Sequence, residues 1–371
     1  MPDNPSARCD PTGQLPADRR SLLAACAGAA AFTLGARPRP AQAQSDAAGA
    51  SLAPSWRAYR ARFLTPDGRV IDTGNQNVSH SEGQGFGMIF AARSGDREAF
   101  ERIWNWTRRS LRRPRDTLHA WRYRPMAQPP VDDLNNATDG DLYIAWALAI
   151  AAERWSVVVW RQQAASIARE ILRNCVRDLR GRTLLLPGAD GFDHADRIVI
   201  NPSYYVFPAL RQLAAIAPDP LWQRLEADGL ALLREARFGR WGLTPDWLEL
   251  PKSAGEARIA AGWPPRFSFD AVRTPLLLAW AGQVTAPSVS ASLRFWLDGT
   301  HARVPAWADL QTNAVADFAA SNGVIAIMRL LTAATGAARS GLVLPAPSRE
   351  DDYYASSLIL LSHAAAADLN M

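Results

Sequence analysis

Cysteine and lysine are both scarce in this chain. Of the 371 residues only three are cysteines, and Cys9 and Cys26 fall in an N-terminal stretch with the character of an export signal, so Cys175 stands alone downstream. A single thiol can form no internal disulfide and no cysteine-based zinc site. Lys252 is the only lysine among 41 basic residues, a bias typical of GC-rich coding. The net charge of +5 is scattered, which argues against a nucleic-acid-binding stripe.

Long hydrophobic runs are missing as well. After residue 43 no segment stays apolar for the roughly 20 residues that a membrane-spanning helix requires, so we expect no stable membrane insertion. Nearer the start, Arg19 and Arg20 precede an uncharged stretch rich in alanine and leucine, and a small-x-small pattern ends at Ala43. This order predicts a signal peptide over residues 1–43, with paired arginines that fit twin-arginine export. A lipoprotein cleavage box at 23–26 is the alternative.

What remains, residues 44–371, has the composition of one folded domain of a periplasmic or secreted protein. Hydrophobic residues make up 48% of the chain and charged residues 21%, which predicts a large buried core that needs no disulfides. Tryptophan is abundant, with 14 residues. Most of these will fill helix interfaces, but exposed indole faces can also stack on pyranose rings.

Helical periodicity dominates the domain, which predicts an all-α fold. The segment 138–155 is apolar nearly all round, and 161–176 behind it is charged on one face. A helix that is apolar on every side must be buried, and one with a charged face can line the outside. Six such apolar helices begin near residues 81, 138, 202, 269, 318 and 353. We therefore predict an (α/α)6 toroid, or barrel, of inner and outer helices, with an open α-solenoid as the alternative.

Polar motifs occur at or just before the starts of the predicted inner helices. Each alone can be explained as a helix cap. Together they would converge at one end of a toroid and place several carboxylates around a shared cleft. Inverting glycoside hydrolysis needs two carboxyl groups roughly 6.5–9.5 Å apart, one protonated and one ionised. The candidate carboxylates are Glu82, Asp139, Asp141 and Asp270.

Three segments in this order resemble glycoside hydrolase family 8. They are Ser81–Met88, Ala137–Leu148 and Phe269–Pro275. The resemblance implies an (α/α)6 fold, an inverting mechanism and no cofactor. Carried over to these positions, it makes Glu82 the general acid and Asp270 the general base. Asp139 would then contact the sugar at the cleavage point.

With an aspartate at 270, the chain resembles the branch of the family that holds many cellulases. Within that branch, Gln84 and the expected absence of an extra binding module resemble the periplasmic endoglucanases that accompany bacterial cellulose synthases. This implies a β-1,4-glucan substrate, the synthase complex as a partner, and a monomer that binds no nucleic acid. Alternatives are the same fold acting on xylan, chitosan or mixed-linkage glucan, a non-catalytic glucan-binding component of cellulose export, and a polysaccharide lyase. A lyase would need a strongly basic groove, which the sequence does not show.

Four further residues are predicted to bind substrate, namely Trp121, Asp141, Tyr204 and Arg273. Trp121 lies in a predicted loop, where core packing does not explain an aromatic side chain. Tyr204 can equally be a buried tyrosine near a helix start, and Arg273 either orients a carboxylate or forms a surface salt bridge. No metal site is predicted, because the acidic segment 190–196 matches no ligand spacing.

The predicted acid poses an electrostatic problem. A helix N-terminus stabilises negative charge and lowers a carboxyl pKa. A general acid needs its pKa raised. Burial or neighbouring carboxylates such as Asp139 and Asp270 would have to outweigh the helix at Glu82.

Overall fold

Eleven α-helices and nine short β-strands form the regular structure of the computed structural model, which describes residues 40–336 and 341–371. The predicted signal segment lies outside the described residues except for 40–43, which begin helix α1 (Pro40–Phe63). Within the described residues, no helix combines the length and apolar character needed to cross a membrane.

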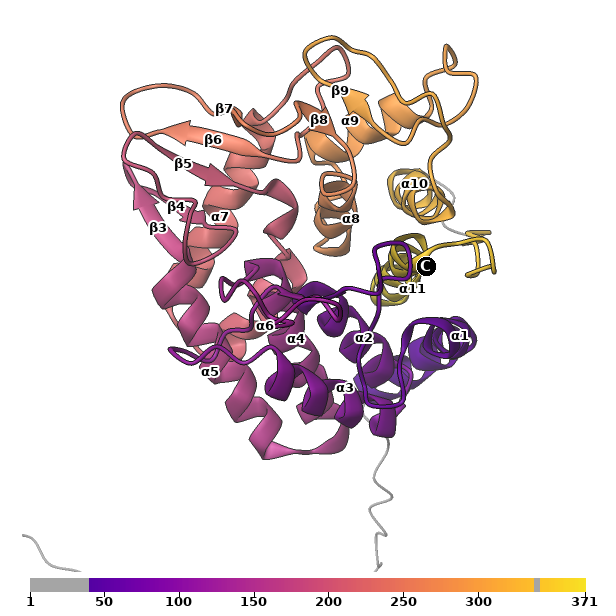
Figure 1. Cartoon of the computed structure of the whole chain (residues 1–371). Coiled ribbons are helices and arrows are strands. Elements are labelled where there is room, and N and C mark those ends of the chain that lie inside the picture. The colour runs from indigo at the N-terminus through magenta and orange to yellow at the C-terminus, as the bar shows by residue number, and fades with distance from the viewer. Residues whose placement is uncertain (1–39, 337–340) are drawn as a thin grey trace, which may run out of the picture. The chain divides into compact units, whose positions relative to one another are not determined.

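Six of the helices form a ring in which each contacts the next along the chain (Figure 1). The ring closes because the last helix, α11, packs against the first, α2, and it also contacts α8. In chain order they are α2 (Ser81–Arg93), α4 (Thr138–Trp155), α6 (Phe207–Ile216), α8 (Arg273–Trp280), α10 (Asn322–Thr335) and α11 (Tyr353–Asp368). Helices α2, α4, α8 and α11 are buried on nearly all sides. The predicted all-α toroid is confirmed, with its six inner helices starting at or within five residues of the expected positions.

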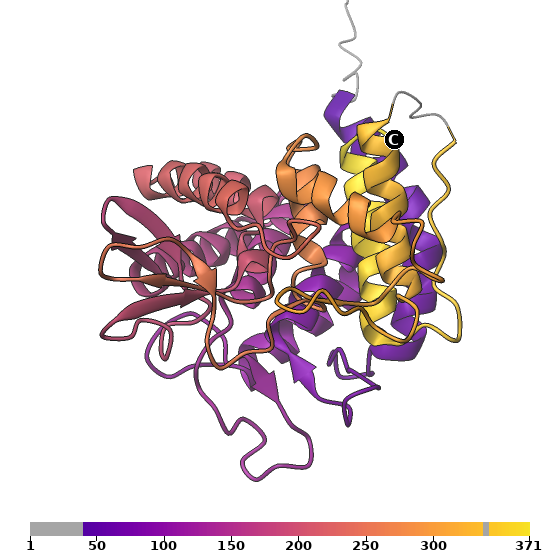
Figure 2. The same cartoon turned by 90° about the horizontal axis from the view of Figure 1, so that it is seen from above.

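The outer layer consists of helices with one buried face: α1, α3 (Arg97–Ser110), α5 (Val158–Cys175), α7 (Pro220–Glu235) and α9 (Pro287–Trp296). Between α10 and α11 the outer position is taken by the extended residues 341–352, beside α11 in Figure 2. Arg329 of α10 donates to the carbonyl of Val343 (3.1 Å), and His363 of α11 lies 2.9 Å from that of Pro345. Because an extended segment covers less surface than a helix does, one face of α10 stays exposed.

Two inner helices, α2 and α4, approach each other closely because glycines face the contact. A Cβ atom added to Gly85 would lie 2.5 Å from Cβ of Tyr143. A Cβ added to Gly140 would lie 2.1 Å from Oγ of Ser81. Neither distance is compatible with a side chain, so glycine is required at both positions. The close packing brings the first turns of the two helices together.

Short antiparallel ladders tie down the loops around the starts of the inner helices. The pairs are β1 (Ser79–His80) with β2 (Arg122–Tyr123), β3 (Val176–Leu179) with β4 (Arg182–Leu185), β5 (Arg197–Ile200) with β6 (Leu248–Pro251), β6 with β7 (Arg258–Ile259), and β8 (Arg266–Phe267) with β9 (Ala308–Asp309). Strand β1 leads into α2, and β8 leads into the turn before α8. The ladders therefore hold the ends of the chain segments that carry the predicted carboxylates.

Candidate active site

Three of the predicted carboxylates meet at one guanidinium group. Glu82 is the second residue of α2, Asp139 is the second residue of α4, and Asp270 lies in the turn before α8. Arg273 Nη1 contacts Glu82 Oε1, and its Nη2 lies 2.9 Å from Asp270 Oδ1 and 3.5 Å from Asp139 Oδ2. The same Nη2 donates to Ser203 Oγ at 2.9 Å. Arg273 is therefore no surface salt bridge: its side chain is 3% exposed and joins three inner helices.

The charges in this cluster do not balance if every carboxyl is ionised. Three carboxylates around one guanidinium leave a net charge of −2, and like charges in a desolvated site favour retention of a proton. Burial and the Asp141 carboxylate raise the pKa of Asp139 to about 7, against the hydrogen bond from Gly140. Burial, with Asp246 and Asp139 as neighbours, raises the pKa of Asp270. The cluster therefore retains a proton more readily than isolated carboxylates would.

Access differs among the three groups. The side chains of Glu82 and Asp270 are 18% and 34% exposed, and that of Asp139 is 3% exposed. A substrate in contact with solvent-exposed surface can thus reach Glu82 and Asp270, whereas Asp139 is buried beside them. Two accessible carboxyl groups on separate chain segments, one to donate and one to accept a proton, are what glycoside hydrolysis requires.

Asp141 is buried and shares none of the exposure of Glu82 and Asp270. Its carboxylate has no exposed surface and accepts hydrogen bonds from the His119 backbone (2.9 Å), from His119 Nδ1 (2.8 Å) and from Asn136 Nδ2 (3.0 Å). The direct substrate contact expected from the sequence is therefore not what the structure shows. Because its acceptors are occupied by the loops before α4, Asp141 holds the helix start that presents Asp139.

Two tyrosines border the carboxylate cluster. Burial and the charges of Asp139 and Asp270 raise the pKa of half-buried Tyr204 well above its ordinary value. Tyr354 of α11 donates its hydroxyl to the carbonyl of Phe269, next to Asp270. Tyr204 was predicted from the sequence, and the contact of Tyr354 with the Asp270 turn was not.

Another buried aspartate, Asp246, was missed by sequence reasoning. It lies before β6, and its Oδ1 accepts hydrogen bonds from the backbone of Ser268 (3.0 Å) and Ala271 (2.7 Å). No motif surrounds it, and its partners are more than 20 positions along the chain. Only the fold brings it to the turn that carries Asp270.

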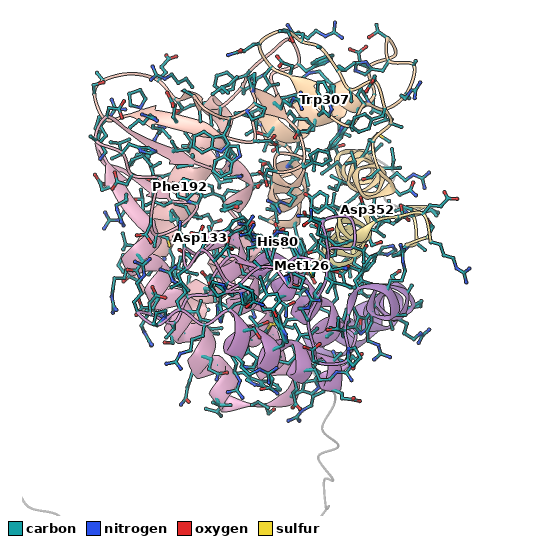
Figure 3. All side chains as sticks on the ribbon, viewed as in Figure 1. His80, Met126, Asp133, Phe192, Trp307 and Asp352 are labelled. Carbon is teal, nitrogen blue, oxygen red and sulfur yellow. The ribbon has the colours of Figure 1, made fainter. Side chains whose placement is uncertain are left out.

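Trp121 stands next to the start of α2. Its carbonyl accepts a hydrogen bond from Ser81 (3.0 Å), and its half-buried ring stacks on His80 with centroids 6.0 Å apart. The guanidinium of Arg122 lies over the Trp121 ring, 4.2 Å from its centroid, and Asp133 accepts a hydrogen bond from the indole nitrogen at 2.8 Å. In Figure 3 His80 and Asp133 lie near each other on the side that faces the viewer. Trp121 is thus fixed in place close to Glu82.

A second aromatic group was not predicted. The rings of Phe192, Trp247 and Trp263 form a stack with centroid separations of 5.9 and 5.0 Å, and Tyr204 lies 6.4 Å from the Trp247 ring. These residues come from three different loops, so no spacing in the sequence indicates the stack. Through Tyr204 it continues towards Asp139 and Asp270.

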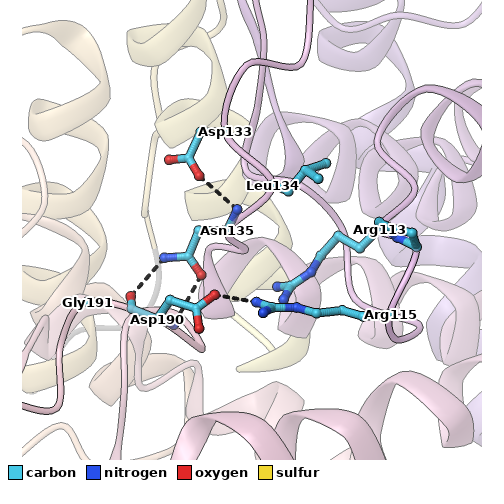
Figure 4. A pocket seen from close by; sticks show the side chains of 8 residues that line it. Arg113, Arg115, Asp133, Leu134, Asn135, Asp190 and Gly191 are labelled. Carbon is cyan, nitrogen blue, oxygen red and sulfur yellow. Dashed lines mark hydrogen bonds and ion pairs between the residues drawn. The ribbon is translucent and has the colours of Figure 1, made fainter.

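Beyond Trp121 lies a polar cavity of about 420 Å³ (Figure 4). Its lining residues are Arg113, Pro114, Arg115, Asp133, Leu134, Asn135, Asp190 and Gly191. Asp133 belongs both to this lining and to the Trp121 contact. Arg115 pairs with Asp190, and Asn135 bonds to the Asp190 backbone at 2.8 and 3.2 Å. In the part of the chain that the structure describes, no group of three or more possible metal-ligating side chains was found.

An α/α toroid with paired carboxyl groups at the N-terminal ends of its inner helices has the construction of a glycoside hydrolase. Residues 39–368 match the family of glycosyl hydrolases family 8, and the chain belongs to that family. A probable endoglucanase of Novacetimonas hansenii is 42% identical over 325 residues, covering 87% of this chain and 93% of its own. An endoglucanase of Cellulomonas uda is 41% identical over 277 residues, covering 74% and 76%. The structure of the endo-β-1,4-glucanase CMCax from Acetobacter xylinum superposes with a TM-score of 0.81 at 41% identity, covering 88% of this chain and all of that one.

Proposed function

We propose that this protein is an endo-acting β-1,4-glucanase that hydrolyses cellulose-like chains with inversion. The observation that carries the proposal is the meeting of Glu82, Asp139 and Asp270 around Arg273. Relatives named endoglucanases, 41–42% identical over most of the chain, support the substrate.

In the proposed reaction Glu82 donates a proton to the glycosidic oxygen as the bond from that oxygen to the anomeric carbon breaks. Asp270 accepts a proton from a water molecule whose oxygen attacks the anomeric carbon from the opposite face. Asp139, buried beside Arg273, holds the sugar at the cleavage point. Arg273 fixes the positions of all three carboxyl groups before substrate arrives, so no rearrangement is needed in the chemical step.

Trp121 extends the site along the substrate. Its indole lies beside the segment that carries Glu82, and the polar cavity follows through Asp133. A flat aromatic surface near the acid suits the apolar face of a glucosyl unit. An open series of contacts of this kind favours cleavage within a chain.

The proposal also gives the enzyme a place in the cell. We assign it to the periplasm or the exterior, as a monomer that serves cellulose synthesis beside the synthase complex. The predicted signal segment and the cellulase-type residues Gln84 and Asp270 support this role. Fractionation of cells that express the full chain, and co-purification with the synthase, test it.

The activity is tested with Glu82→Gln and Asp270→Asn on carboxymethyl cellulose. Each variant should lose hydrolysis and still fold, because each replacement keeps the shape of the side chain. Glu98→Gln on the exposed face of α3 is the matched control and should remain active. Full activity in either of the two site variants rules out the assigned roles.

Substrate and stereochemistry are tested separately. Xylan, chitosan and mixed-linkage glucan are assayed beside carboxymethyl cellulose for released reducing sugar. NMR of the anomer first formed from cellopentaose should show the α-anomer, as inversion requires. A first-formed β-anomer would exclude the mechanism.

A further inference from the structure

The turn that presents Asp270 is held from outside by Asp246. Asp246 is 8% exposed, and its Oδ1 accepts both the Ser268 and the Ala271 backbone N–H groups. Its own N–H donates to the carbonyl of Arg266 at 2.7 Å, which ties the loop before β6 to strand β8. The carboxylate and the backbone of Asp246 therefore both join the loop before β6 to the segment that carries Asp270.

These bonds hold the turn just before α8, and the first N–H groups of the helix have other acceptors. The N–H groups of Arg273 and Thr274 donate to the carbonyls of Asp270 and Ala271. Buried N–H groups in a turn need an acceptor too, and an ionised carboxylate is a stronger one than a neutral group. Asp246 supplies this acceptor, although it lies 22 positions before Ser268. The segment 268–271 is thus anchored at both ends, with Asp270 between the anchors.

We propose that Asp246 is a positioning residue for Asp270, acting through the backbone of the 268–271 turn and through its own negative charge beside the base. The proposal rests on the assignment of Asp270 as general base. The charged and titratable groups that face Asp270 are Asp246, Asp139 and Arg273, with Tyr204 and Tyr354 at the border of the cluster.

The charge of Asp246 has a definite direction of effect. Together with burial and Asp139, it raises the pKa of Asp270. A base with a higher pKa accepts a proton more strongly once it is ionised. Asp246 itself is buried, which raises its pKa, while hydrogen bonds from Ala271, Ser268 and Asp270 favour its ionised form.

The test separates the two effects with two variants. Asp246→Asn keeps an oxygen acceptor but no charge, so the pKa of Asp270 should fall. The acid limb of the kcat/KM profile should then move to lower pH by about one unit. Asp246→Ala removes the acceptor as well, so kcat should fall about 100-fold while KM changes by less than about threefold. Asp228→Asn is the control, because Asp228 also accepts a backbone N–H, from Thr183 at 2.7 Å, away from the cluster.

The outcomes are distinct. If the pH profile of kcat/KM for Asp246→Asn superimposes on that of the wild type, the proposed role of the charge is overturned. If Asp246→Ala has a lower melting temperature but an unchanged kcat, Asp246 has a structural role only. If the asparagine variant does not fold, Asp246→Ser, which keeps a hydroxyl acceptor, should show the same shift. Asp270→Asn is measured alongside. If that variant is active, the assignment of Asp270 as general base fails. If Asp270→Asn is inactive but the acid limb of the kcat/KM profile does not move in Asp246→Asn, only the present inference is overturned.

Discussion

Asp139→Asn should make the protein more stable at alkaline pH while it lowers hydrolysis. Asp139 is 3% exposed, and its Oδ1 accepts the Gly140 N–H at 2.8 Å. An asparagine keeps that acceptor and resembles the protonated acid in shape. The change therefore removes the burial of a charge without opening a cavity.

The size of the effect follows from the pKa of Asp139, which burial raises to about 7. An aspartate in the unfolded chain has a pKa of about 3.9, and each unit of difference corresponds to about 1.36 kcal/mol. A raised pKa contributes stability that is fully present below about pH 4 and is lost as pH rises through about 7. The full difference, about 4 kcal/mol, is an upper bound because Arg273 lies 3.5 Å away. We expect a gain of about 2–4 kcal/mol for Asp139→Asn at pH 8.5 and roughly a third of that, about 1 kcal/mol, at pH 5, because pH 5 lies between the unfolded and the folded pKa.

The assay is urea unfolding of wild type and variant at pH 5 and pH 8.5, followed by tryptophan fluorescence. For a domain of this size the expected gain at pH 8.5 corresponds to a rise in melting temperature of several degrees. Asp317→Asn, at an exposed loop position, is the control and should change stability at neither pH. A variant that is equally stable or less stable than wild type at pH 8.5 would refute the argument that Asp139 carries an unfavourable buried charge.

Two further substitutions test how the site is assembled. Arg273→Lys should lower kcat on carboxymethyl cellulose by about 100-fold, because a single ammonium group cannot reproduce the guanidinium fork that reaches Glu82, Asp139 and Asp270; a kcat within twofold of wild type would contradict this role. Trp121→Ala should raise KM for cello-oligosaccharides by about tenfold, the loss of roughly 1.4 kcal/mol of aromatic contact, with kcat little changed. Steady-state kinetics on cellopentaose measure it, and an unchanged KM would remove Trp121 from the binding surface.

The helices and the three carboxylates Glu82, Asp139 and Asp270 could be predicted because apolar periodicity and short motifs are properties of neighbouring residues. Helix α4 begins at Thr138 and ends at Trp155 as its apolar run indicates. Three starts, those of α6, α8 and α10, were placed four or five residues too early. The residues before α6 form the 3-10 turn Pro202–Tyr204, and those before α8 form the turn that Asp246 holds. In both places the polar residues precede a turn and then the helix, an order that periodicity alone does not resolve.

What could not be predicted depends on contacts between distant segments. The ladders have two to four residues each, too few for an alternating pattern to stand out. Helix α1 was not predicted, because its segment begins inside the assigned export signal. Asp141 was expected in the cleft because it shares a motif with Asp139. Two positions along a helix turn a side chain by about 200°, so the two aspartates face different surroundings, and Asp141 bonds to His119 and Asn136 in the interior.

A helix N-terminus lowers a carboxyl pKa and burial raises it, and the sizes of the two effects decide which one prevails. The N-terminus of a helix stabilises a nearby carboxylate by about 0.3–1 kcal/mol, and by about 2 kcal/mol where partly buried. Complete burial can shift a pKa by up to about 3–5 units, which is about 4–7 kcal/mol. Asp139 lies in the first turn of α4, yet burial raises its pKa to about 7, so desolvation outweighs the helix at this position. A glucan that covers the open side would exclude water from Glu82 and Asp270 as well. The binding of substrate should therefore strengthen the retention of a proton in the cluster, at the moment when the leaving oxygen needs one.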